Sequence, residues 1–440
     1  MLSCTGKRSH RHTILHVSFS NSFGLASARP TPQGLSGAPK NILKVMQSKS
    51  SIMYILILVV LIWYHFFAYV GFSSFSSIFN GICYVAAVVM FIISANAISF
   101  EKYKLPTLIL ISTILSMFMS NILWNQEMFD IIKGFRCYFL ILVFFFLCAK
   151  NADVQEVEKA LVMLAIIYVC CWIYQTLKVP ELIFGMDRDG DLGNTEQRGF
   201  YRFWIPTKEN MPILLLYFFE KYRRTKHIAY LILVPVCLLI IVFHVGRQMI
   251  FWSFLSFVIL ILYHYRTQWK KIALSAVIVY ALFNIMVDYV PTLNLLFAQT
   301  ETQVDSAYDD IRLKSMNFYW EQSVKNPAGF LFGNGIGGGG ELQKFTEDAT
   351  MKGYYESDIG YFALLFDFGL FGLVTYILLF VQILRMKIDD KYIYLKCYLI
   401  YIYGSYALAH ALTTNIFFNM CAIYIIYHSQ CRNVQAEFND

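Results

Sequence analysis

The sequence predicts an all-α, polytopic membrane protein of about twelve transmembrane helices. Hydrophobic residues make up 58% of the 440 residues, charged residues only 15%, and the mean hydropathy is +0.52. The apolar residues are also grouped into runs of roughly 20, the length that an α-helix needs to cross the hydrocarbon of a bilayer. A soluble domain has no use for so much apolar surface, so the chain is expected to be embedded in a membrane.

Residues 1–50 differ in composition from the remainder of the chain. They are rich in Ser, Arg, Lys and His and contain no acidic residue. Such a segment is typical of an organellar transit peptide, or of a wrongly assigned upstream start with Met46 as the true beginning, and we favour the second interpretation. In both cases we expect a disordered basic extension.

Residues 51–430 are predicted to form one transmembrane helical domain, and residues 431–440 a cytoplasmic tail. The sixth apolar run is short and the last two are nearly continuous, so the count of spans is about twelve. The runs lie at residues 52–70, 78–98, 106–124, 131–149, 160–178, 209–220, 228–243, 248–264, 272–290, 357–384, 392–412 and 414–428.

Basic residues in the short connections predict the orientation of these spans. One set of connections, which includes residues 150–159, 221–226, 264–271 and 385–391, is rich in Lys and Arg and is assigned to the cytoplasm. This assignment places both termini in the cytoplasm and the two long loops, residues 179–208 and 291–356, on the outer side. The net charge of +7 is therefore a feature of topology and does not indicate nucleic-acid binding.

The loop of residues 291–356, between the ninth and tenth spans, is the main candidate for a functional segment, because loops carry reactive groups on a rigid scaffold. Residues 306–325 have the apolar spacing of an amphipathic helix. Arg312 borders its apolar stripe, so this helix is predicted either to lie on the membrane surface, with Arg312 at headgroup depth, or to pack as a lid. The stripe consists of Tyr308, Ile311, Ser315, Met316, Tyr319, Trp320 and Val324.

Basic residues near the outer ends of the spans form a candidate anion site. Charges in or near hydrocarbon are costly, and Arg suits phosphate because its planar fork donates two hydrogen bonds at once. Each residue taken singly could be a snorkelling or topological charge, whereas the set, which runs against the positive-inside bias, favours anion binding. The set consists of Lys133, Arg136, Arg198, Arg202, Lys208, Arg247 and Arg312.

Acidic residues are fewer. Glu356 and Asp358 lie at the start of the tenth span, and Asp367 follows nine residues after Asp358 without cleanly sharing its face of the predicted helix. Residues 333–340 contain a formal G-x-G-x-x-G without a preceding strand or a P-loop Lys-Ser/Thr, so they are interpreted as an anion nest or a flexible linker. The ten cysteines show no metal-ligand spacing with His, and no metal or cofactor is expected.

These motifs resemble the O-antigen polymerase and O-antigen ligase superfamily, over roughly residues 100–430. The resemblance rests on the Gly246-Arg247 turn and on two longer patterns, Arg312…Trp320…Pro327…Gly333-Asn-Gly335 and Glu356-Ser-Asp358…Gly369-Leu-Phe-Gly372. Ligases of this superfamily place a His eleven residues before the first Gly of the closing G-x-x-G. Here that position is Asp358, and this difference favours a polymerase.

The resemblance implies that the chain polymerises oligosaccharide repeat units linked to undecaprenyl pyrophosphate, at the periplasmic face of a bacterial inner membrane. The product would be O-antigen, capsule or exopolysaccharide. Membrane lipids, a chain-length regulator and a flippase are the further partners that it implies. Two alternatives remain open, namely an O-antigen ligase that transfers glycan to lipid A core, and an exporter or flippase of lipid-linked oligosaccharide.

The expected reaction is a metal-independent, inverting glycosyl transfer. Fixed arginines can stabilise the negative charge that develops on the pyrophosphate leaving group, and Arg202, Arg247 and Arg312 are the residues expected to do so, with Arg198, Lys133 and Arg136 as further binding residues. A carboxylate near a membrane interface can have its pKa raised enough to remove a proton from the incoming sugar hydroxyl. Asp358 is the first candidate for this base and Glu356 the second.

Overall fold

The computed structural model describes residues 51–185, 204–244, 246–268, 270, 310–407 and 412–437. The basic extension of residues 1–50, the predicted span 272–290, Arg198 and Arg202 lie outside these ranges. Within them the regular structure is helical, apart from isolated bridge residues such as the antiparallel pair Tyr69 and Phe184.

Helices long and apolar enough to cross a membrane confirm the all-α class and the presence of candidate spans. In the described part of the chain there are five: Val70–Ala97, which contains α4 (Ser76–Ser94), α5 (Lys104–Trp124), α8 (Val154–Lys178), α11 (Arg247–Tyr265) and α17 (Tyr361–Arg385). A sixth is formed if the pair α6 (Met128–Gly134) and Arg136–Lys150, bent by 61°, counts as one span. The total of twelve remains a prediction.

The other helices of the bundle do not meet this criterion. They are α2 (Ser51–Trp63), α3 (His65–Ala68), α9 (Met211–Thr225), α10 (Ile228–Phe243), α18 (Ile393–Ser405) and α19 (Leu412–Glu437). Helix α10, which has the bounds of its predicted span and is apolar, is 16 residues long. The first predicted span ends early because the chain after α2 pairs with a distant segment. The amide of Val70 donates to the carbonyl of Ile183 (2.9 Å), and the amide of Gly185 donates to that of Ala68 (3.0 Å).

The core of the bundle is rich in tyrosine. Helix α18 packs against α9 and α11, and α19 packs against α8 and against the helical stretch η3 (Arg136–Ile141) that continues into α7 (Leu142–Lys150). Buried tyrosine hydroxyls in this core bond to other elements, as Tyr398 does to Asn210 Oδ1 (2.9 Å) and Tyr424 to the carbonyl of Ala152 (2.6 Å). Such bonds satisfy polar groups that are costly to bury alone.

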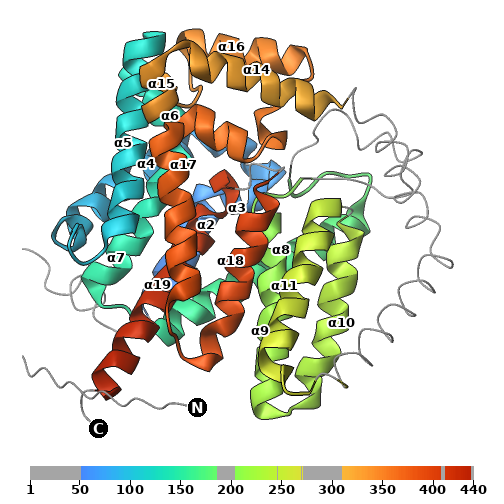
Figure 1. Cartoon of the computed structure of the whole chain (residues 1–440). Coiled ribbons are helices and arrows are strands. Elements are labelled where there is room, and N and C mark those ends of the chain that lie inside the picture. Colours follow the sequence, from blue (N-terminus) through green and yellow to red (C-terminus); the bar gives the residue numbers. More distant parts are fainter. Residues whose placement is uncertain are drawn as a thin grey trace, which may run out of the picture. The chain divides into compact units, whose positions relative to one another are not determined.

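The described part of the predicted outer loop is a helical unit packed on α17 and α5 (Figure 1). It comprises α14 (Ile311–Lys325), α15 (Pro327–Phe332), α16 (Gly340–Met351) and the single turn η8 (Glu356–Asp358). Asp310 caps α14 by accepting from the amide of Arg312, and Asn326 caps α15 by accepting from that of Ala328. The unit has its own small core, formed by Tyr319, Leu342, Ala349, Ile359, Ala363 and Phe366.

Candidate functional site

Helix α17 is broken at Gly369, and the break is the feature on which the candidate site depends. Gly369 has φ +67° and ψ −177°, far from helical values. The carbonyls of Phe366 and Asp367 point to donors outside the helix: the amide of Asn334 donates to Phe366 O (2.7 Å) and the amide of Gly335 to Asp367 O (3.2 Å). The hydroxyl of Ser116, from α5, also donates to Asp367 O.

The segment that supplies these donors can approach the backbone of α17 closely because a glycine stands on each side of the contact. A Cβ on Gly333 would lie 2.1 Å from the carbonyl oxygen of Asp367, and one on Gly369 would lie 2.4 Å from the amide nitrogen of Gly333. Gly333 also has φ +97°, which disfavours other residues. We call residues 333–335 the glycine brace. Its amides at Asn334 and Gly335 bond within the protein, so this part of the run serves neither as an anion nest nor as a flexible linker.

Two carboxyl groups meet beside the break. Asp367 is fully buried, and its carboxyl group is hydrogen-bonded to that of Glu356 in the turn η8. Desolvation by burial raises the pKa of the Glu356 carboxyl above its ordinary value, and the hydrogen bond from Asp367 offsets part of this rise. Glu356 and Asp367, which we call the carboxyl pair, therefore form a candidate site for holding and transferring a proton.

Aromatic rings enclose the carboxyl pair. Tyr319, from α14, lies edge-on to Phe366 with 5.1 Å between ring centroids, and Tyr138, from η3, lies 4.8 Å from Phe368. Phe366 and Phe368 are the two chain neighbours of Asp367. Both tyrosines are buried and interact electrostatically with both carboxyl groups. The pair therefore lies between the helical unit of α14 to η8 and the bundle, in surroundings of low polarity.

The sequence interpretation did not find the carboxyl pair. It ranked Glu356 behind Asp358 as a candidate base, and it set Asp367 apart because Asp367 does not cleanly share the face of Asp358 on a helix that starts near residue 357. Helix α17 instead begins at Tyr361, after a reversal at Gly360 with φ +52°. The available signal was Gly360 itself, a glycine two residues after Asp358. Asp358 is partly exposed and accepts a hydrogen bond from the Ser357 hydroxyl (3.4 Å).

The described basic residues of the predicted anion site lie on five separate elements, one of which is the turn η6 (Lys208–Asn210), which begins with Lys208. Lys133 is exposed on α6, Arg247 is the first residue of α11, and Arg312 lies in the first turn of α14. Arg136 begins η3, and its guanidinium Nη1 lies 3.3 Å from Nε2 of His65. Of the set, Arg312 is on the helical unit that also carries Glu356. Whether all these residues serve one ligand remains a prediction.

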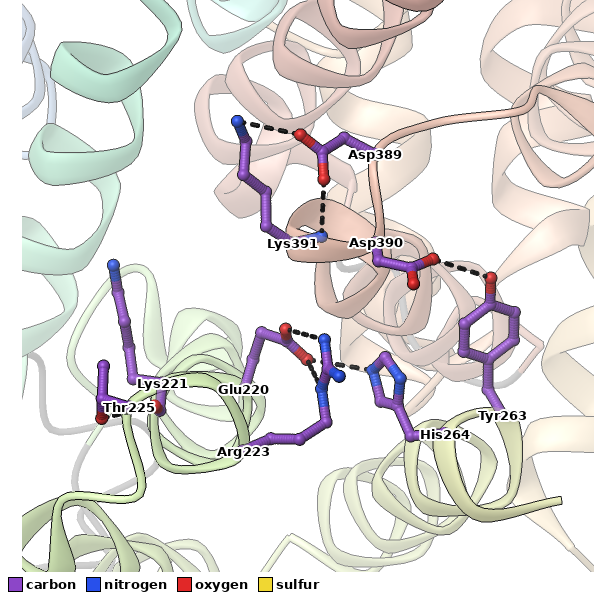
Figure 2. Close-up of polar contacts among 9 residues, drawn as sticks. All are labelled: Glu220, Lys221, Arg223, Thr225, Tyr263, His264, Asp389, Asp390 and Lys391. Atoms are coloured by element: carbon purple, nitrogen blue, oxygen red, sulfur yellow. Dashed lines mark hydrogen bonds and ion pairs between the residues drawn. The ribbon is translucent and has the colours of Figure 1, made fainter. Parts of the chain in front are cut away.

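A second polar cluster, absent from the sequence interpretation, ties together three connections (Figure 2). Glu220 of α9 is buried and pairs with Arg223 (2.7 Å) and with Nε2 of His264 at the end of α11 (3.0 Å). Tyr263 donates to Asp390 (3.3 Å), next to the ion pair of Asp389 with Lys391 (2.9 Å). The sequence had assigned these three connections to one side of the membrane, and the structure places them together.

The described side chains include no group of three or more His, Cys, Asp or Glu that could hold a metal ion. They do include the carboxyl pair, which is a candidate for acid–base chemistry. They also include the ion-pair cluster of Glu220, Arg223 and His264, at the ends of α9 and α11. Comparisons with known protein families, with curated proteins and with solved structures return no match for this chain.

Proposed function

We propose that the protein is a membrane glycosyltransferase that polymerises oligosaccharide repeat units carried on a polyprenyl pyrophosphate. The observation that carries this proposal is the carboxyl pair, Glu356 with Asp367, which lies between the helical unit of α14 to η8 and the broken apolar helix α17. The resemblance in residues 312–372 supports the same reading. An enzyme that acts on a lipid-linked substrate needs its catalytic groups near the junction of apolar and polar surroundings, and the position of the carboxyl pair beside an apolar helix supports the proposal.

Glu356 is proposed as the general base, in place of Asp358. A hydroxyl oxygen of the acceptor sugar attacks the anomeric carbon of the donor, and its proton passes to the Glu356 carboxylate. The bond from the anomeric carbon to the phosphate oxygen breaks, and the pyrophosphate leaves with the electron pair. A base with a raised pKa is better matched to this task than an ordinary carboxylate, and Asp367 holds it in place through their hydrogen bond.

The basic residues are proposed to stabilise the leaving group. Arg312 lies on the helical unit that carries Glu356, and Arg247 begins α11 after the Gly246 turn. A guanidinium can neutralise the charge that develops on the pyrophosphate as the bond breaks, without a metal ion. Lys133 and Arg136 are proposed to bind the same anion in its ground state.

The test is the length distribution of the glycan in cells that depend on this chain. We expect Glu356→Gln and Asp367→Asn to abolish long chains and leave product with a single repeat unit. Glu341→Gln, on exposed α16 of the same helical unit, is the matched control and should leave the ladder unchanged. Asp358→Asn separates the two candidate bases, because loss of long chains only in that variant would make Asp358 the base.

The same gels distinguish the alternatives. Long chains that remain on the lipid carrier in Glu356→Gln would indicate a ligase, and lipid-linked single units trapped in the inner leaflet would indicate an exporter. A normal ladder in both Glu356→Gln and Asp367→Asn, with each variant folded and present in the membrane, would overturn the proposal.

A further inference from the structure

Helix α14 carries a strip of apolar side chains that the rest of the described structure leaves partly exposed. Leu313, Trp320 and Val324 are between 42% and 50% exposed. They lie within about 40° of one another around the helix axis, as the 3.6-residue period requires. The predicted stripe of this helix had placed Trp320 and Val324 with Tyr319, but the structure separates them.

The face by which α14 is attached to the protein is a different one. Ser315, Tyr319 and Ser323 are buried, and Tyr319 packs on Phe366 of α17. A third face, with Lys314 and Glu321, is exposed and charged. Helix α14 thus has an inner face against the protein, a charged face, and between them the strip of Leu313, Trp320 and Val324.

The strip continues into the exposed apolar surface of α17. The ring of Trp320 lies edge-on to those of Phe330 in α15 (5.9 Å) and Phe362 in α17 (6.4 Å). Leu331 and Phe332 of α15 are exposed beside them, and α15 packs along α17. Further along α17 the exposed side chains are again apolar, namely Leu370, Val374, Ile377 and Leu378.

We infer that the strip of α14 is immersed in the hydrocarbon of the lipid leaflet around α17, so that α14 lies in the membrane surface. Lipid acyl chains are the occupant because the strip is continuous with the exposed face of a helix that is long and apolar enough to span the bilayer. A tryptophan at the border of that face and lysines on the charged face match the preference of these residues for the interface. This placement fixes the depth of the helical unit, and it holds whether or not the proposed function does.

Nitroxide labels on the full chain in phospholipid nanodiscs test the inference. A ketone-bearing amino acid at position 324 or 313 accepts a label without involving the native cysteines, and positions 321 and 314 on the charged face are the matched controls. Collisions with apolar oxygen should exceed those with a water-soluble nickel chelate at 324 and 313, and this order should reverse at 321 and 314.

Two results would overturn the inference. If nickel reaches positions 324 and 313 as readily as 321 and 314, the strip lies in water. If neither reagent reaches them, protein covers the strip. Because the readout is local to each label, loss of glycan product in a labelled variant would not affect the conclusion, and correct folding is checked by the unchanged elution of each labelled chain in nanodiscs.

Discussion

The backbone amide of Asn334 donates a 2.7 Å hydrogen bond to the carbonyl oxygen of Phe366, and the Asn334 side chain donates a second one of 3.3 Å to the same oxygen. The glycine brace is thereby joined to the break in α17, one residue from Asp367. Glu356 belongs to the helical unit that contains the brace, and Asp367 belongs to α17. The position of the carboxyl pair therefore depends on the hydrogen bonds between the brace and α17.

Gly369→Ala should destabilise the protein strongly. A Cβ there would lie 2.4 Å from the amide nitrogen of Gly333, in a residue with φ +67°. The backbone conformation alone costs about 1–3 kcal/mol for a non-glycine residue, before the clash is counted. Unfolding temperature in detergent measures the loss. Gly81→Ala, in α4 where a Cβ meets nothing within 4 Å, is the control and should be neutral or stabilising by up to about 1 kcal/mol.

Glu220→Gln should also destabilise the protein. The substitution removes the charge that pairs with Arg223 and His264, whose side chains are 25% and 5% exposed. Breaking a buried ion pair costs about 3–5 kcal/mol, and the partial exposure of Arg223 places the expected loss near the lower end. Lys344→Ala, which breaks the exposed pair with Glu341, should change stability by no more than about 0.5 kcal/mol. Equal losses for the two variants would contradict a structural role for the cluster.

The stability of the parent protein should depend on pH through Glu356. Its folded-state pKa is raised above 4.5 because the carboxyl is desolvated. A raised pKa contributes stability that is present while the group is protonated and is lost as the pH rises through the folded-state value. Paired melts above about pH 4.5 should therefore show the parent losing unfolding temperature relative to Glu356→Gln as the pH rises. A constant difference between the two proteins would show that the pKa of Glu356 is not raised.

Arg312→Ala should reduce the yield of long glycan chains by about a hundredfold, if Arg312 stabilises the leaving group. Arg312→Lys should recover part of this loss, because it restores the charge without the two-pronged fork. Lys314→Ala, at an exposed position two residues along α14, is the control and should retain the parental ladder. If Arg312→Ala behaves like the control, the predicted role of Arg312 is wrong.

The sequence by itself determined that the chain is helical and apolar enough for a membrane, because both follow from composition and from the length of apolar runs. It also singled out the loop of residues 291–356 and, behind Asp358, Glu356, since a polar stretch between apolar helices is visible without any coordinates. It could not place the break in α17, because Gly369 has apolar neighbours on both sides, Phe368 and Leu370, and the apolar run continues beyond it.

Only the tertiary structure decided which groups meet. The bond from Ser116 to Asp367, the glycine brace against α17, and the cluster of Glu220 with His264 join segments that are far apart in the chain. Periodicity reports on neighbours along one helix, whereas these contacts join different helices. The chain path near α17 also depends on left-handed glycines, such as Gly333 in the brace and Gly360 before the helix. Because the backbone turns at Gly360, Glu356 lies against α17, and its carboxyl group reaches that of Asp367.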